Sequence, residues 1–123
     1  MNLTSSRMPD SLTELAQQLD QFAKERDWQQ FHSPKNLASA LVVEAGELLE
    51  HFQWMTEAQS RELTPEKREA VAAEVSDVLL YLIQLSTALG IDPIAAAQAK
   101  LQINALKYPV ARARGTSKKY DEL

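Results

Sequence analysis

Three prolines that each follow a helix-capping residue constrain the fold more than any other feature of this sequence. They form the pairs Ser33-Pro34, Thr64-Pro65 and Asp92-Pro93. Proline suits the first turn of an α-helix because its missing N–H needs no partner there, and a preceding Ser, Thr or Asp can accept a hydrogen bond from a free backbone amide. The segment Ser11-Leu12-Thr13-Glu14 adds a capping box, so the chain is predicted to begin four helices.

The predicted helices cover residues 11–27, 34–57, 65–89 and 93–107, and Gly90 supplies a left-handed C-cap for the third. Strands are not expected, because β-branched residues are sparse and no long segment alternates apolar with polar residues. Short connections between helices of this length favour antiparallel neighbours. We therefore expect an all-α protein, built as an antiparallel four-helix bundle.

The length of 123 residues indicates one domain. We expect a flexible segment at 1–10, a helical domain at 11–108 and a basic, flexible tail at 109–123. Within the third helix, the run from Val78 to Ile83 is apolar around the whole circumference. A helix without a polar face is central or lies in a subunit interface, so we predict at least a dimer.

The composition excludes several classes of function. The chain has no cysteine and two histidines, which excludes thiolate zinc sites, iron–sulfur clusters and a three-histidine metal site, and suits a cytoplasmic protein. A net charge of −4 argues against binding to nucleic acid polymers or anionic lipid. We expect neither a membrane span nor a signal peptide, because no apolar run approaches about 20 residues and residues 1–10 lack an apolar core.

Four acidic residues lie on the apolar faces of the second and third predicted helices. They are Glu44 and Glu47, and Glu74 and Asp77, each pair spaced i, i+3. At about 100° per residue, Glu44 falls within about 60° of Leu37, Leu41 and Leu48. Ionised carboxylates survive in a helical core only when they are paired or bound to a cation. Oxygen ligands select hard ions such as Mg²⁺, with Mn²⁺ as a substitute, so the pattern suggests metal-assisted attack on a phosphate ester or anhydride.

Other interpretations of these acids remain open at this point. The four carboxylates could be solvated, or could pair with Lys and Arg of another subunit. A di-iron bundle also gathers acids from facing helices, but it requires Glu-x-x-His, and Leu48 stands three residues before His51. The whole chain could also be a helical oligomerisation module or a protein that binds nucleotides without hydrolysing them.

Longer segments resemble a known family. They are Trp28 to Leu37 (WQQFHSPKNL), Glu44 to Leu48 (EAGEL), Phe52 to Trp54 (FQW), Glu74 to Tyr81 (EVSDVLLY), Lys100 to Asn104 (KLQIN) and Lys107 to Pro109 (KYP). In order and spacing, the chain from about residue 11 resembles the MazG-like all-α nucleoside triphosphate pyrophosphohydrolases. Among these it is most similar to the dCTP pyrophosphatase branch.

The resemblance implies a Mg²⁺-dependent hydrolase that cleaves a (deoxy)nucleoside triphosphate between the α and β phosphates, releasing the monophosphate and pyrophosphate. dCTP or 5-modified dCTP is the substrate implied, for cleansing or balancing the nucleotide pool. Related enzymes act on dUTP or other triphosphates. The resemblance also implies a homodimer or a dimer of dimers, with sites formed across subunits.

The resemblance also assigns roles to single residues. The metal ligands implied are Glu44, Glu47, Glu74 and Asp77, one of which could instead act as a general base. Lys100 would complement phosphate charge, Asn104 would bind the sugar or base, and Tyr108 belongs to the same substrate-binding set. The nucleoside pocket implied is lined by Trp28, His32, Trp54 and Tyr81.

Overall fold

The computed structural model describes residues 11–123, so the predicted flexible segment at 1–10 lies outside the described residues. The described part is helical and contains no strand, which confirms the all-α prediction. Its elements in chain order are α1 (Leu12–Glu25), η2 (Gln29–Phe31), α2 (Pro34–Glu50), α3 (Glu57–Arg61), α4 (Pro65–Ala88), α5 (Pro93–Lys107), α6 (Val110–Ala113) and η3 (Tyr120–Glu122).

The predicted caps are confirmed. The Ser11 hydroxyl accepts from the Glu14 amide, the Ser33 hydroxyl from Asn36 and the Thr64 hydroxyl from Lys67, all at 3.2 Å. The Asp92 carboxylate accepts from Ile94 and Ala95. Each proline follows its cap at the first turn, so α2, α4 and α5 begin where the sequence predicted.

The predicted end of the second helix is wrong. α2 ends at Glu50 rather than near residue 57, and turns occupy 51–54. Thr56 then caps α3 through a reciprocal pair of hydrogen bonds, because its hydroxyl accepts from the Gln59 amide and its own amide donates to the Gln59 side chain. This Thr-x-x-Gln capping box favours a new helix over continuation of the old one.

The end of α1 fixes the position of Trp28. Asp27 adopts a left-handed conformation (φ 53°), and the amides of Asp27 and Trp28 donate to the carbonyls of Lys24 and Ala23. This is a Schellman C-cap, with aspartate where glycine is more usual. The Trp28 ring then lies edge-on to Phe22, with 5.7 Å between the ring centroids.

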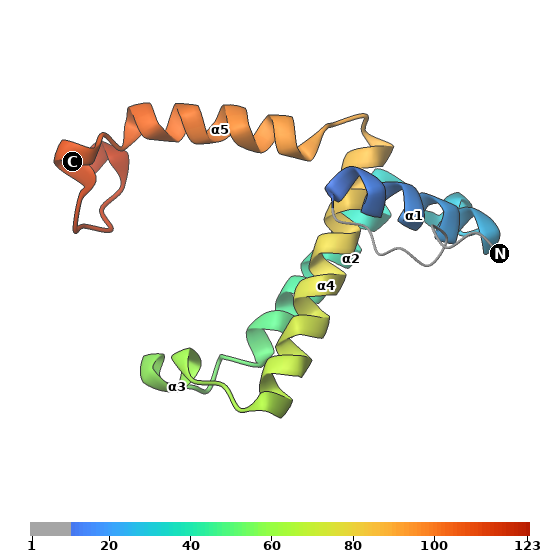
Figure 1. Ribbon diagram of the computed structural model, residues 1–123, viewed down its shortest axis with the longest axis horizontal. Helices are drawn as coiled ribbons and strands as arrows, with labels where there is room; N and C mark the ends of the chain where they lie inside the picture. Colours follow the sequence, from blue (N-terminus) through green and yellow to red (C-terminus); the bar gives the residue numbers. More distant parts are fainter. Residues whose placement is uncertain (1–10) are drawn as a thin grey trace. The chain divides into compact units, whose positions relative to one another are not determined.

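Among the described residues, 11–90 form one compact unit. Within it α2 and α4 lie side by side along their lengths, and α1 contacts α4 (Figure 1). The buried residues of the described chain are Ala23, Leu37, Ile83 and Ser86. The core of this unit therefore lies where α1, α2 and α4 meet, toward the carboxyl end of α4.

Residues 91–123 form a second compact unit. Here the chain after α5 folds back on the end of that helix. The rings of Tyr108 and Tyr120 meet edge to face with centroids 6.2 Å apart, and Lys107 Nζ lies 4.8 Å from the Tyr120 centroid. Because α5 belongs to this unit, the four-helix bundle stays a prediction, as does the flexibility of 109–123.

α4 is the longest helix, with 24 residues. Among the described residues it is the one helix long and apolar enough to cross a membrane by length and composition alone, with a mean hydropathy of 1.3 over its most apolar stretch. The central helix of a bundle meets the same criterion. The two acidic residues in the middle of α4, Glu74 and Asp77, favour the bundle interpretation.

Candidate metal centre

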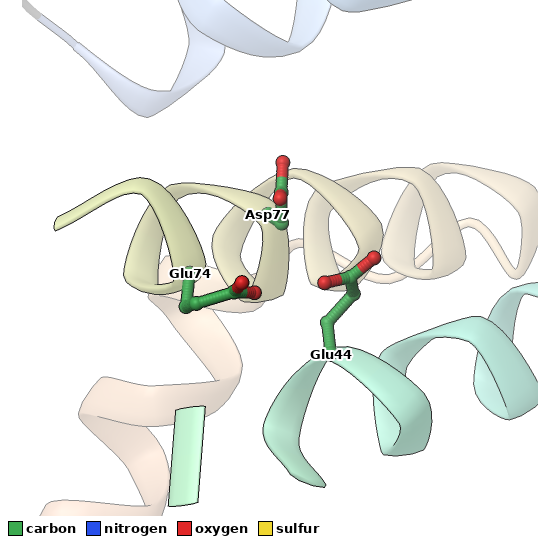
Figure 2. Close-up of side chains that lie close together, drawn as sticks. All are labelled: Glu44, Glu74 and Asp77. Atoms are coloured by element: carbon green, nitrogen blue, oxygen red, sulfur yellow. The ribbon is translucent and has the colours of Figure 1, made fainter. Parts of the chain in front are cut away.

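Three of the four predicted acids meet between α2 and α4. Glu44 projects from α2 toward Glu74 and Asp77 on α4, and one oxygen of each carboxylate lies within 4.8 Å of the others (Figure 2). All three side chains are half-buried. The arrangement brings three oxygen donors to one point from two helices.

Helix register explains this convergence. Glu74 and Asp77 are spaced i, i+3 and so share one face of α4. On α2, Glu44 lies seven residues after Leu37, which is about two turns along the same face. Leu37 is 1% exposed in the core. Burying Leu37 therefore turns Glu44 toward the same interior, where α4 presents its two acids.

Two oxygens of the cluster are buried and lack partners. Glu44 Oε2 and Glu74 Oε2 are shielded from solvent and make no hydrogen bond. The ion pairs found in residues 11–123 join Lys24 to Asp20 and Arg26 to Glu25, so none reaches the cluster. An unpartnered buried carboxylate oxygen is costly, and a bound cation is a common way to satisfy it.

The local electrostatics agree with this interpretation. The pKa of Glu44 is raised from 4.5 to about 7, first by hydrogen bonding with Glu47 and then by burial and by the nearby Glu74 and Asp77. Glu47 is itself exposed, but it lies beside Glu44, because its side chain is the first cause of the raised pKa of Glu44. Carboxylates crowded together raise one another's pKa until a positive charge relieves the repulsion. The donor set therefore fits a hard divalent cation.

His32, one of the predicted nucleoside-pocket residues, lines a cavity of about 160 Å³. The cavity is bounded by α1, the segment around η2, the start of α2 and the end of α4. Its lining residues are Ala16, Leu19, Asp20, Ala23, Gln29, His32, Leu37, Ile83, Gln84, Thr87 and Ala88. Apolar walls with a few polar groups are typical of sites for small ligands.

The structure does not bring all four predicted pocket residues together. Tyr81 is half-buried on α4, between Asp77 and Gln84 in sequence. Trp28 is 45% exposed beside α1. Trp54 is 88% exposed in the turn after α2, whereas His32 precedes that helix. A helix of 17 residues is about 25 Å long, so His32 and Trp54 of one chain do not line one pocket.

The remaining predicted residues belong to the second unit. Lys100 is exposed, Asn104 is half-buried on α5, and Tyr108 caps the end of that helix and packs against Tyr120. Their roles toward substrate stay predictions.

Gln84 is a polar residue of the cavity that the sequence analysis missed. Its side-chain nitrogen lies 3.3 Å from His32 Nδ1. The available signal was its spacing, because Gln84 follows Asp77 by seven residues and so lies two turns further along the same face of α4. A lone glutamine carries no motif, and nothing in the sequence paired it with His32.

Comparison with known proteins defines the class. Residues 40–123 match the MazG-like family. Over 105 residues, 84% of the chain, the sequence is 47% identical to dCTP pyrophosphatase 1 of Homo sapiens and 43% identical to that of Bos taurus. The chain belongs to the MazG-like family.

The curated relatives are longer, and the matched region spans 62% of their length. A solved structure is similar over nearly its whole length. It is a pyrophosphatase from Archaeoglobus fulgidus, with a TM-score of 0.76 and 36% identity over 84% of this chain and 96% of that one.

Proposed function

We propose that this protein is a Mg²⁺-dependent nucleoside triphosphate pyrophosphohydrolase, which converts a (deoxy)nucleoside triphosphate into the monophosphate and pyrophosphate. The carboxylate cluster of Glu44, Glu74 and Asp77, with two buried oxygens that lack partners, carries this proposal. Family membership and relatives named dCTP pyrophosphatase 1 favour dCTP or 5-modified dCTP as the substrate.

The metal ligands proposed are Glu44, Glu74 and Asp77, with Glu47 beside them. All the donors are carboxylate oxygens, which suits Mg²⁺ and allows Mn²⁺ as a substitute. A bound divalent cation would supply charge neutralisation of the triphosphate and a lowered pKa for water.

The chain's own residues would then act in three ways. The cluster would hold the divalent cation at the place where the phosphates bind, beside α2 and α4. One carboxylate accepts the proton of the attacking water. Glu47 is assigned this role because its side chain is exposed. The water oxygen forms a bond to phosphorus as the phosphoanhydride bond between the α and β phosphates breaks, and pyrophosphate leaves.

Residues around the cluster are assigned to the rest of the substrate. His32 and Tyr81 are proposed to contact the nucleoside, and Trp28 is proposed to line the same pocket. Trp54 would contact the nucleoside of a neighbouring copy, because it lies at the opposite end of α2. From the second unit, Lys100 would bind phosphate oxygens, and Asn104 and Tyr108 would bind the sugar or base.

The pattern of exposed apolar residues supports assembly as a homodimer or a dimer of dimers. α4 carries a second apolar face beside the one that meets α2, made of Val75, Leu79 and Leu82, which are 49%, 38% and 42% exposed. Their spacing of four and three residues puts them on one stripe. An exposed apolar stripe of this kind is typical of a subunit interface.

We further propose that the enzyme works in the cytoplasm to cleanse or balance the nucleotide pool, and that it binds neither nucleic acid polymers nor membranes. The second candidate is a non-enzymatic helical module that assembles or binds nucleotides through the same surfaces. The exposed apolar stripe on α4 would serve either role. The same hydrolysis acting on dUTP or another triphosphate is the nearest variant of the main proposal.

The test is product analysis. The purified chain is incubated with a panel of canonical and 5-modified triphosphates in Mg²⁺, and in parallel with EDTA. We expect monophosphate and pyrophosphate in equal amounts with Mg²⁺ and none with EDTA, with the cytosine substrates turned over fastest. Release of orthophosphate, or metal-independent turnover, would contradict the mechanism. Binding without any product would establish the non-enzymatic candidate.

A further inference from the structure

We propose that Gln84 selects the base of the substrate, with its side-chain carbonyl accepting a hydrogen bond from the exocyclic amino group of cytosine. The assignment rests on the proposed function, and it adds a specificity-determining residue on α4. The carboxylate cluster would bind at the phosphates and would not distinguish cytosine from uracil.

The size of the cavity beside Gln84 suits a single six-membered ring. Its volume is about 160 Å³. An engineered protein cavity of about 150 Å³ accommodates benzene, so this cavity is large enough for a single pyrimidine ring. Leu19, Leu37 and Ile83 provide apolar walls for the faces of the ring. The polar groups of His32 and Gln84 lie at one side, where the ring's edge would meet them.

The cavity also lies at the right distance from the carboxylate cluster. On α4, Gln84 is seven residues beyond Asp77, and on α2, Leu37 is seven residues before Glu44. Both spacings correspond to about 10 Å along one helix face. Because both helices give the same separation, a nucleotide can extend along α2 and α4 with its phosphates at the acids and its base at the cavity.

The contact with His32 orients the Gln84 amide. Gln84 Nε2 lies 3.3 Å from His32 Nδ1, so the amide donates to this ring nitrogen when histidine is neutral with its proton on Nε2. The Gln84 carbonyl oxygen is then left to accept. It can receive a hydrogen bond from the amino group of cytosine, whereas the corresponding carbonyl of uracil would face it with a second acceptor.

The cavity lining holds a second oriented amide, that of Gln29. Gln29 Nε2 donates to Asp20 Oδ1 at 3.0 Å, and the other Asp20 oxygen is held by Lys24 at 2.9 Å. These contacts occupy the Gln29 nitrogen and the Asp20 carboxylate with one another. Gln29 is exposed, whereas Gln84 is half-buried beside His32, so Gln84 is the better placed of the two glutamines to select the base.

The experiment compares kcat/KM for dCTP and dUTP in wild type, Gln84→Leu and Gln84→Glu. One lost hydrogen bond of this kind corresponds to roughly a tenfold change, so Gln84→Leu should lower the dCTP to dUTP ratio about tenfold, mostly through KM for dCTP. Gln84→Glu keeps an acceptor at this position and should retain most of the preference. The matched control is Gln21→Leu on α1, whose amide bonds only Glu25 in the exposed face of the helix.

The outcomes separate this inference from the proposed function. Wild type that turns over dCTP, with a Gln84→Leu ratio unchanged or with both substrates reduced equally, would overturn the role of Gln84 alone. Wild type that releases no pyrophosphate would overturn the proposed function. In that case binding of the α,β-imido analogues of dCTP and dUTP tests Gln84 by itself, with the same tenfold change expected and an unchanged ratio overturning the inference.

Discussion

The two units of this chain differ in charge and in how they bury apolar surface. Residues 91–123 hold six of the 13 basic residues and three of the 17 acidic ones, so the preceding part of the chain is strongly acidic. The first unit has its own small core around Leu37 and Ile83. In the second, no residue of α5 is buried, and Leu101 and Leu106 are 67% and 84% exposed.

Because of this difference, we expect the two parts of the proposed site to form under different conditions. The carboxylate cluster is formed entirely within the first unit, by two helices that pack against each other. The cationic and amide groups proposed for the substrate belong to a helix with no core of its own. We therefore expect metal binding to be a property of the folded chain, and substrate recognition to depend on assembly.

Removing one metal ligand should have the largest effect. Glu74→Gln keeps the volume of the side chain but loses a charged oxygen donor, and we expect kcat to fall at least about 100-fold. Pyrophosphate release measures the loss, and circular dichroism checks the fold. Glu69→Gln, an exposed acid on the same helix, is the matched control and should retain full activity. Equal activity in both variants would remove the cluster from the reaction.

Introducing charge on the second apolar face of α4 should separate assembly from metal binding. Leu82→Glu places a carboxylate on a stripe that we expect to be covered by another copy, so the mass measured by light scattering should fall toward the 13.8 kDa of a single chain. Activity should fall with it, while Mg²⁺ still binds. Gln98→Glu on α5 is the control. A variant that stays assembled would place the interface elsewhere.

The raised pKa of Glu44 predicts how the carboxylate cluster responds to pH when no metal is bound. The folded-state pKa of about 7 lies above the ordinary value of 4.5, so this group favours folding at low pH, and its contribution is lost as pH rises from 4.5 through about 7. A metal requires the ionised form, so Mg²⁺ affinity should rise about tenfold between pH 6 and pH 8. Calorimetric titration measures this, and Glu44→Gln should remove the pH dependence along with most of the affinity.

Loss of a cation in the second unit should affect substrate and spare the metal. Lys100→Gln removes a charge proposed to contact phosphate, and we expect KM to rise up to about tenfold with little change in Mg²⁺ affinity. Lys35→Gln, which neutralises an exposed lysine at the start of α2, serves as the control. A changed Mg²⁺ affinity in Lys100→Gln would show that the two units are not separable in this way.

Local signals in the sequence were sufficient to predict where the helices begin. Ser33, Thr64 and Asp92 act at short range, so each cap could be recognised without knowledge of the tertiary structure, and the helix starts were predicted correctly. The same kind of signal was present at Thr56 and Gln59, and was missed because the apolar pattern of the preceding helix continues through Phe52 and Trp54.

The part of the site that depends on helical spacing could be predicted from the sequence. Glu44, Glu74 and Asp77 were identified because each shares a face with core residues, and the structure brings them together. The contact between Gln84 and His32 joins residues 52 positions apart, so no spacing rule reaches it. Trp54 lies beyond the opposite end of α2 from His32, so the role proposed for Trp54 involves a neighbouring copy of the chain, which a single sequence does not describe.

The proposed activity requires that the carboxylates between α2 and α4 form a divalent metal site. Electron paramagnetic resonance of added Mn²⁺ tests it most directly, because bound and free ions give distinct signals without any substrate. We predict saturable Mn²⁺ binding by the wild-type chain, displaced by Mg²⁺ and lost in a Glu44→Gln, Glu74→Gln double variant that remains folded. Wild-type protein that leaves Mn²⁺ free, or a double variant that binds it equally well, would show that these carboxylates do not form a metal site.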